Sequence, residues 1–186
     1  EVVGRSGEAV NAGLRKMAIA LRLFGGFSLE RAGKGGDGLS YEKGRALLAY
    51  VAVESDTSHS RRKLAALFWP DHPANAALAN LRLVLLNLRQ ALEAVGLPML
   101  LIDRESVRFA PETLLTVDTA RFSSILAKAA NMSAGQQASI PDLQELATAA
   151  ALYRGEFLAG FALPECPDFE TWLQMRREAW HRDALA

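Results

Sequence analysis

Three consecutive cations, Arg61, Arg62 and Lys63, follow Ser60 at the predicted start of a helix. Serine is a residue type that caps helices, so the three cations fall in the first turn. The aligned peptide dipoles favour anions at this end of a helix, and each cation there costs about a few tenths of a kcal/mol. Three such placements indicate an anionic partner, because a phosphate would meet free backbone N–H groups and cationic side chains together. A solvated basic face is the alternative, and the triplet alone does not separate the two.

The next predicted helix, residues 74–94, carries a second set of candidate binding side chains. Its exposed face follows from placing Leu81 at the centre of the buried face and advancing 100° per residue. Asparagine and glutamine amides can pair with adenine, and leucines can contact the methyl group of thymine. Two leucines on this face also suit burial against a second protein surface, although the sequence favours the DNA interpretation. The exposed face carries Ala79, Leu83, Leu86, Asn87 and Gln90, with Asn80, Arg82 and Arg89 at its margins.

Other residues with chemical potential do not form recognisable sites. His59, His72 and His181 are not spaced as a pair of metal ligands on one helix, and Cys166 is the only cysteine. The glycine-rich run 33–38 has the spacing G-x-G-x-x-G, but no long βαβ unit follows it, so a flexible turn is the better interpretation. No nucleophile is paired with a base. We therefore expect no enzymatic activity, no cofactor and no metal.

Two predicted helices separated by a forced break position the first two sets of residues. The first helix has Leu64, Leu67 and Phe68 on one face, and Trp69-Pro70 ends it. The second begins after Pro73 and is longer. A short helix, a tight turn and a longer helix follow the plan of a helix-turn-helix. The apolar stripe of the longer helix consists of Leu78, Leu81, Leu85, Leu88 and Leu92.

Strands are predicted on both sides of these helices. Alternating residues predict a strand from about residue 18 to 24 and a second short strand from Phe27 to Leu29. Ser40 is the predicted cap of a helix that leads into the helix-turn-helix. After that motif, two short strands flank the polar tip Asp103–Ser106, which contains Arg104. This order predicts an α+β winged helix-turn-helix at residues 17–112.

Beyond Pro111 the pattern predicts helices alone. One helix is capped by Asp118 or Thr119, the next spans residues 142–154 and the last begins near Asp168. Paired helices with small residues where they cross suggest an all-α tetratricopeptide-like domain at residues 113–186. The last helix is still in its pattern where the sequence ends, so we expect a truncated domain. Residues 1–16 are expected to be a flexible leader or linker, with Met17 as a possible natural start.

Charge and composition are those of a globular protein with two unlike halves. The net charge of the 186 residues is zero, but residues 17–110 hold 12 Lys and Arg against 9 Asp and Glu. Residues 111–186 hold 6 against 10, which suits a nucleic-acid-binding half joined to an acidic, partner-binding half. No segment resembles a membrane span or a signal peptide, so we expect a cytoplasmic protein without a membrane partner.

Long motifs give the chain a likeness to a known family. In order, they are LRLFGGFSLE, KGRALLAYVAV, LAALFWPD, ANLRLVLLNLRQAL, VRFAP, TVDTARF, LYRGEFLAGF and FETWLQMRREAW. This series resembles the antibiotic-regulatory transcription activators, over about residues 18–186. Proteins of that family begin with a winged helix of the response-regulator type and continue into a bacterial transcriptional activator domain.

The resemblance implies a DNA-binding function with assigned roles. The helix at 74–94 would enter the major groove, the hairpin wing would touch the neighbouring groove, and the helical domain would contact protein. By motif, Asn80, Leu81 and Arg82 match the Asn-Leu-Arg of the family, and Leu88 with Arg89 matches its later Leu-Arg. The implied partners are double-stranded DNA and either RNA polymerase or another protein, and the chain is a possible homo-oligomer.

The chain also departs from the family pattern on the exposed face of that helix. Leu86 and Asn87 stand where the family commonly has a polar residue and an arginine, and Gln90 stands where a second arginine often follows. Leu83 replaces a frequent polar residue. We predict a DNA-binding transcriptional activator; the alternative is a signalling or scaffold protein that uses the same fold as an interaction platform without binding DNA. For DNA binding, the candidate residues are Ser60, Arg61, Arg62, Lys63, Asn80, Arg82, Asn87, Arg89, Gln90 and Arg104.

Overall fold

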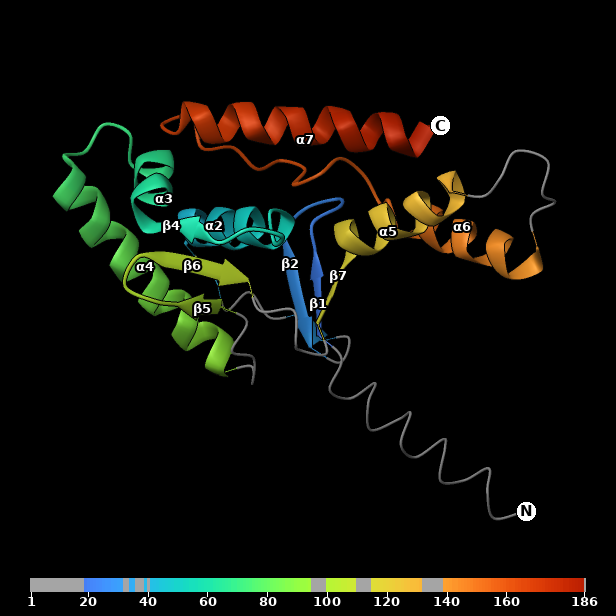
Figure 1. Ribbon diagram of the computed structural model, residues 1–186, viewed down its shortest axis with the longest axis horizontal. Coiled ribbons are helices and arrows are strands. Elements are labelled where there is room, and N and C mark those ends of the chain that lie inside the picture. Colours follow the sequence, from blue (N-terminus) through green and yellow to red (C-terminus); the bar gives the residue numbers. More distant parts are fainter. Residues whose placement is uncertain are drawn as a thin grey trace, which may run out of the picture.

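The computed structural model describes residues 19–31, 34–35, 39, 41–94, 100–109, 115–131 and 139–185. They form a mixed α/β structure (Figure 1). The strands are β1 (Ile19–Arg22), β2 (Ser28–Arg31), β3 (Lys34–Gly35), β4 (His59–Ser60), β5 (Leu100–Ile102), β6 (Ser106–Phe109) and β7 (Leu115–Val117). The helices are α2 (Glu42–Val53), α3 (Arg61–Phe68), α4 (Ala74–Ala94), α5 (Asp118–Ala130), α6 (Ile140–Leu152) and α7 (Pro167–Leu185). Within these described ranges, no helix has both the length and the apolar character needed to cross a membrane.

A four-stranded sheet joins two distant parts of the chain. Its strand order is β3-β2-β1-β7, with β2 antiparallel to β1 and β7 parallel to it. Leu21 of β1 is buried, while Arg22 forms an ion pair with Glu30 of β2 at 2.9 Å, as the predicted alternation requires. Strand β7 corrects the expectation that the chain beyond Pro111 is helical alone. Three residues are too few to show a period of two, and their pairing partner lies at the other end of the sequence.

Helices α2, α3 and α4 pack together, and a second sheet of order β4-β6-β5 lies beside them (Figure 1). We refer to these helices and this sheet as the three-helix unit. The predicted helix 74–94 and the hairpin around Asp103–Ser106 are confirmed. The predicted apolar stripe of α4 is also confirmed for four of its members, because Leu81, Leu85, Leu88 and Leu92 are buried.

The predicted capping hydrogen bond of α3 is absent. Helix α3 begins directly after Ser60, but the side chain of Ser60 makes no capping hydrogen bond. Instead, the backbone of Ser60 belongs to β4, where the residue pairs with Ser106 of β6. Strand β4 was not predicted, because two residues carry no periodic signal. The predicted cap Ser40 lies outside the described residues.

Helices α5 and α6 pack against each other as a pair. Lys128 of α5 reaches Glu145 of α6 at 3.3 Å. Ser139 begins α6 with a capping box, in which its backbone N–H donates to the carboxylate of Asp142 at 2.8 Å. Among the described residues beyond Pro111, this pair is the one helical hairpin, since α7 takes a different course.

Helix α7 runs over both halves of the structure, from α3 at one end to α5 at the other (Figure 1). Near its start, the Phe169 ring lies 5.3 Å from that of Phe68 at the end of α3. Near its other end, the indole N–H of Trp180 donates to the hydroxyl of Ser123 on α5 at 3.2 Å. These contacts make α7 a bridge, rather than a third helix stacked on α5 and α6.

Glycines of two motifs, LRLFGGFSLE and LYRGEFLAGF, lie against each other where the turn after β1 meets the segment after α6. Gly25 (φ +78°) and Gly155 (φ +142°) both adopt backbone conformations that favour glycine. A Cβ on Gly155 would lie 3.3 Å from the Cα of Gly25, so the two chains could not approach as closely with any larger residue. The approach allows the N–H of Leu158 to donate to the carbonyl of Leu23 at 2.7 Å. The segment LYRGEFLAGF is thereby fixed against the end of β1.

Candidate nucleic-acid interface

Four arginines from three separate segments line one groove of about 520 Å³. Arg61 and Arg62 come from the start of α3, Arg82 comes from α4, and Arg104 comes from the turn between β5 and β6. We call this hollow the arginine groove. Its lining is completed by Ser60, Leu78 and Glu105.

Backbone hydrogen bonds hold the hairpin turn against the start of α3. The N–H of Arg61 donates to the carbonyl of Glu105 at 2.8 Å, and the Arg61 guanidinium donates to the carbonyl of Asp103 at 3.1 Å. Residues His59 and Val107 pair across β4 and β6, which extends the same junction. The turn and the helix start therefore form one rigid edge of the arginine groove.

The turn itself is locked by Asp103. Its carboxylate accepts hydrogen bonds from the N–H of Glu105 at 2.8 Å, the N–H of Ser106 at 2.6 Å and the Ser106 hydroxyl at 2.7 Å. The bond from the Ser106 hydroxyl, followed by those from the two backbone N–H groups, holds the pKa of Asp103 below the ordinary value of an aspartate. The carboxylate stays ionised and bonded, so the exposed Arg104 is presented from a fixed turn.

The electrostatic character of the arginine groove is strongly positive. Within the described ranges, Arg62, Arg82 and Arg104 take part in no ion pair, and Glu105 is the only acidic residue that lines the groove. Helix α3 adds the positive end of its dipole at the same place. Such an arrangement can bind an anion with several negative oxygens, such as the phosphates of a nucleic-acid backbone.

The exposed face of α4 lies beside the arginine groove. Leu83, Leu86, Asn87 and Gln90 are all exposed, as predicted, and no hydrogen bond to another described residue occupies the amides of Asn87 and Gln90. Leu86 follows Arg82 by four residues, so the two side chains are neighbours on the helix surface. The two amides and the two leucines of this face are thus free to contact a molecule bound in the arginine groove.

Three other candidates are less available. Asn80 is half-buried. Arg89 is exposed, but its guanidinium is bound by Glu93 at 2.7 Å, and this hydrogen bond raises the pKa of Arg89. Lys63 lies apart from the arginines: it lines a hollow of about 620 Å³ together with residues such as Tyr50. Lys63 lies about 200° around the helix from Arg61, at 100° per residue, which explains why it lines a different hollow.

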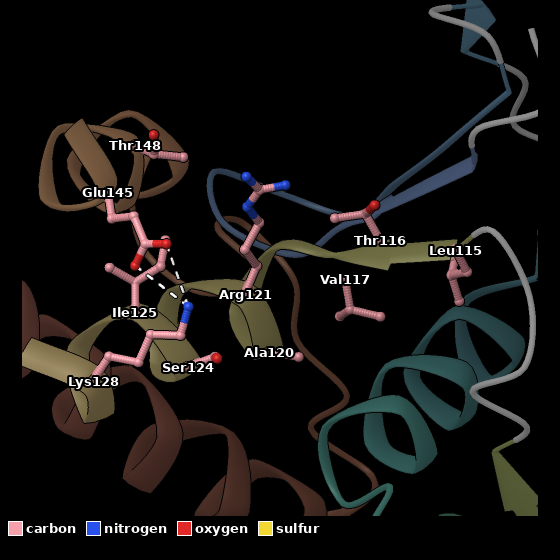
Figure 2. A pocket seen from close by; sticks show the side chains of 10 residues that line it. All are labelled: Leu115, Thr116, Val117, Ala120, Arg121, Ser124, Ile125, Lys128, Glu145 and Thr148. Atoms are coloured by element: carbon pink, nitrogen blue, oxygen red, sulfur yellow. Dashed lines mark hydrogen bonds and ion pairs between the residues drawn. The ribbon is translucent and has the colours of Figure 1, made fainter. Parts of the chain in front are cut away.

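A further hollow of about 450 Å³ runs along β7 and the α5–α6 pair. Figure 2 shows Lys128 bound to Glu145 across the two helices, with Arg121 standing between this pair and Thr116 of β7. The hollow has no connection with the candidate DNA-binding residues. Its lining belongs entirely to β7, α5 and α6.

The sequence analysis did not identify several features of the arginine groove. Glu105 was not selected, and Leu78 was assigned only to the buried stripe. The locked turn was accessible from the pattern Asp103-x-x-Ser106, because aspartate side chains commonly bond to backbone N–H groups two and three residues further on. The contribution of β4 had no sequence signal.

Comparison with known proteins gives a structural similarity but no match in sequence. No family model matches the chain, and no curated protein matches it. Among solved structures, the chain is similar to EmbR of Mycobacterium tuberculosis in complex with a low-affinity phosphopeptide, with a TM-score of 0.62 and 18% sequence identity. The match covers 91% of this chain and 43% of the EmbR chain, so this chain spans less than half the length of that protein. At this level of identity, the two share a fold.

Proposed function

We propose that the protein is a DNA-binding transcriptional regulator, with α2, α3, α4 and the β5–β6 hairpin acting as a winged helix-turn-helix. The observation that carries the proposal is the arginine groove, where Arg61, Arg62, Arg82 and Arg104 gather from three segments. A metabolite pocket would not need four cations on an open surface, whereas a duplex presents phosphates over that whole span. The sequence resemblance to transcription activators supports the same conclusion.

In this proposal, the position of each residue determines which part of the duplex it contacts. Arg61, Arg62 and Arg82 contact phosphates and set the orientation of the protein. Helix α4 enters the major groove, where Asn87 and Gln90 reach base edges. The hairpin acts as the wing and carries Arg104 to the backbone of the adjacent groove.

The remaining candidates take secondary roles. Ser60 and Lys63 flank the phosphate contacts, and Lys63 would serve only through its long side chain, because it faces the neighbouring hollow. Asn80 and Arg89 lie at the margins of the reading face. Each is expected to contribute less than the residues of the arginine groove.

We propose a protein-contact role for the helical half, as the start of a tetratricopeptide-like activator domain at residues 113–186. Its outer surface supports this role, because Ile140 and Leu143 of α6 are 74% and 56% exposed. RNA polymerase or another protein is the proposed partner, and the protein would act in the cytoplasm as an activator. No catalytic step belongs to this proposal.

A second function is favoured by one observation. Leu83 and Leu86 on α4 are 58% and 51% exposed, and large apolar side chains on an outer face often mark protein contacts. The three-helix unit would then be an interaction platform that does not bind DNA. We place this alternative second because it needs an acidic or phosphorylated protein partner to occupy the arginine groove, whereas the phosphates of a duplex match arginines presented from three segments.

Fluorescence anisotropy with a labelled mixed-sequence duplex, measured over a series of salt concentrations, separates the two functions. DNA binding predicts affinity that falls steeply as salt rises, because each neutralised phosphate releases counterions. A plot of log affinity against log salt is expected to have a slope near −3 to −4 for contacts by four arginines, at about 0.9 per phosphate. Absence of binding at low salt would contradict the proposal and leave the interaction platform.

A further inference from the structure

We propose that α4 selects A·T base pairs, with thymine methyl groups packed against Leu83 and Leu86. This inference rests on the DNA-binding function proposed above and names the sequence class that the reading face recognises. It is carried by the composition and exposure of that face, rather than by the arginine groove.

The two leucines form one apolar patch at the edge of the phosphate site. Leu83 and Leu86 are three residues apart on α4, so their side chains adjoin, and both leave about half of their surface to solvent. Leu86 is also the neighbour of Arg82, which lines the arginine groove. A duplex held by the arginines would therefore meet the patch directly.

The chemistry of the patch matches one base. In the major groove, thymine alone among the four bases presents a methyl group. Burying that methyl against a leucine removes apolar surface of both from water, which stabilises the complex. A guanine or cytosine edge at the same place would leave its polar groups facing leucine without a hydrogen-bond partner.

The polar residues of the reading face indicate the same base pair. Asn87 and Gln90 are exposed, and a side-chain amide can bind adenine in the bidentate pattern, in which its N–H donates to N7 and its carbonyl oxygen accepts from the N6 amino group. Arginine is the usual reader of guanine, but Arg89 is held by Glu93 at 2.7 Å and Arg82 lies at the arginine groove. Amides for adenine and leucines for thymine together favour A·T pairs.

A second copy of the chain is a less suitable occupant of the patch. A symmetric interface places the same surface on both partners. Two arginine grooves, each lined by four arginines and one glutamate, would then be brought near each other and would repel. A DNA duplex suits both, because its thymine methyl groups can contact the two leucines while its phosphates bind the neighbouring arginines.

Replacement of thymine by deoxyuridine tests the inference at the level of a single methyl group. Duplexes bound by the 186-residue protein are first selected from a randomised library, and each thymine of the selected site is then replaced in turn by deoxyuridine. At the one or two positions that contact the leucines, we expect the affinity of the wild-type protein to fall about fourfold, as for the loss of one buried methyl group. Selected sites are expected to be rich in A·T pairs at the same positions.

Leucine truncation then identifies the side chain that senses the methyl group. Leu83→Ala and Leu86→Ala should each bind the thymine and deoxyuridine forms of their position equally. Leu185→Ala, which truncates an exposed leucine (75%) at the end of α7, serves as the matched control and should keep the fourfold preference. Because all three side chains are exposed, the thermal unfolding temperature should change little.

The outcomes separate the inference from the function on which it rests. Salt-dependent DNA binding with no preference for thymine over deoxyuridine, or a preference that survives in both leucine variants, would overturn the inference alone. Failure of the wild-type protein to bind any duplex would overturn the DNA-binding function and the inference together. A wild-type dimer that becomes monomeric in Leu83→Ala or Leu86→Ala would assign the patch to a second copy and overturn the inference.

Discussion

Asp118 is a single residue on which two parts of the chain depend. Its carboxylate, 4% exposed, accepts hydrogen bonds from the N–H groups of Leu23 at 2.9 Å, Phe24 at 3.0 Å and Thr119 at 2.8 Å. It therefore joins the first turn of α5 to the end of β1. The predicted cap was wrong, because Val117 holds the cap position of α5 without a side-chain hydrogen bond and Asp118 is the first residue of the helix. Arg154 lies 3.6 Å away and partly offsets the buried charge.

Replacement Asp118→Asn is expected to lower the free energy of unfolding by about 1–3 kcal/mol, because the amide group cannot accept from all of these buried donors. Urea unfolding of the variant and the wild type measures the difference. Asp142→Asn is a suitable control: Asp142 also closes the start of a helix, but its site is exposed. Equal effects of the two substitutions would contradict the role assigned to burial.

The same residue makes a prediction about pH. Burial raises the pKa of Asp118 above the ordinary value of an aspartate, although its hydrogen bonds to backbone N–H groups and Arg154 act in the opposite direction. The folded protein thus takes up this proton at a higher pH than the unfolded chain. The stability from this protonation is complete below the ordinary pKa and is lost as the pH rises through the raised pKa. The loss of unfolding free energy caused by Asp118→Asn should accordingly be larger in acid and should decrease as the pH rises from the ordinary to the raised pKa. A loss that does not depend on pH would argue against the raised pKa.

At the scale of elements, the arginine groove depends on how α3, α4 and the β5–β6 hairpin are joined. Arg61 has a double task, since it binds the carbonyl of Asp103 and also lines the arginine groove. Arg62 and Arg82 have no such structural bonds among the described residues. They are therefore the cleaner probes of phosphate binding.

Combined replacement of Arg62 and Arg82 by alanine should weaken binding to all DNA sequences to a similar degree. Each lost phosphate contact reduces the steepness of the plot of log affinity against log salt by about one. The plot for the double variant should therefore be about two units less steep. Salt titrations monitored by anisotropy give both quantities. Arg121→Ala, at an exposed position of α5 away from the arginine groove, should leave the slope unchanged. An unaltered slope in the double variant would remove both arginines from the interface.

At the scale of the whole molecule, α7 couples the three-helix unit to the α5–α6 pair. Glu54, at the end of α2, accepts from the indole N–H of Trp172 at 2.7 Å and from the Nε of Arg176 at 2.9 Å. The Trp172 ring also lies 4.9 Å from that of Tyr50 and 5.7 Å from that of Phe157. The three-helix unit and the segment after α6 thus share one aromatic cluster.

Trp172→Ala should lower the free energy of unfolding by about 3–5 kcal/mol, as expected for a large aromatic side chain lost from a core. We further expect the two halves to lose their common unfolding transition, because the shared cluster is interrupted. Hydrogen exchange followed separately in α3 and α5 measures this directly. Met175→Ala, an exposed position of the same helix, should preserve coincident exchange. Separate transitions in the wild-type protein would contradict the coupling.

The sequence by itself determined most of the helices and the hairpin, because their signals are local. The stripe of Leu81, Leu85 and Leu88 repeats with the period of a helix, and Pro70 and Pro73 mark the break before α4. The exposure of Leu83 and Leu86 followed from the same arithmetic. The types of the candidate binding residues were also evident, since charge and position within a helix turn can be read from the chain.

Only the tertiary structure decided which of these residues lie together. Arg62 and Lys63 are adjacent in sequence but line different hollows, while Arg104 joins Arg62 across a backbone pairing of β4 with β6. Strand β7 likewise exists through its partner β1, and α7 takes its course from aromatic contacts at both ends. Such arrangements depend on pairing and packing between distant segments, and neither leaves a periodic trace in the local sequence.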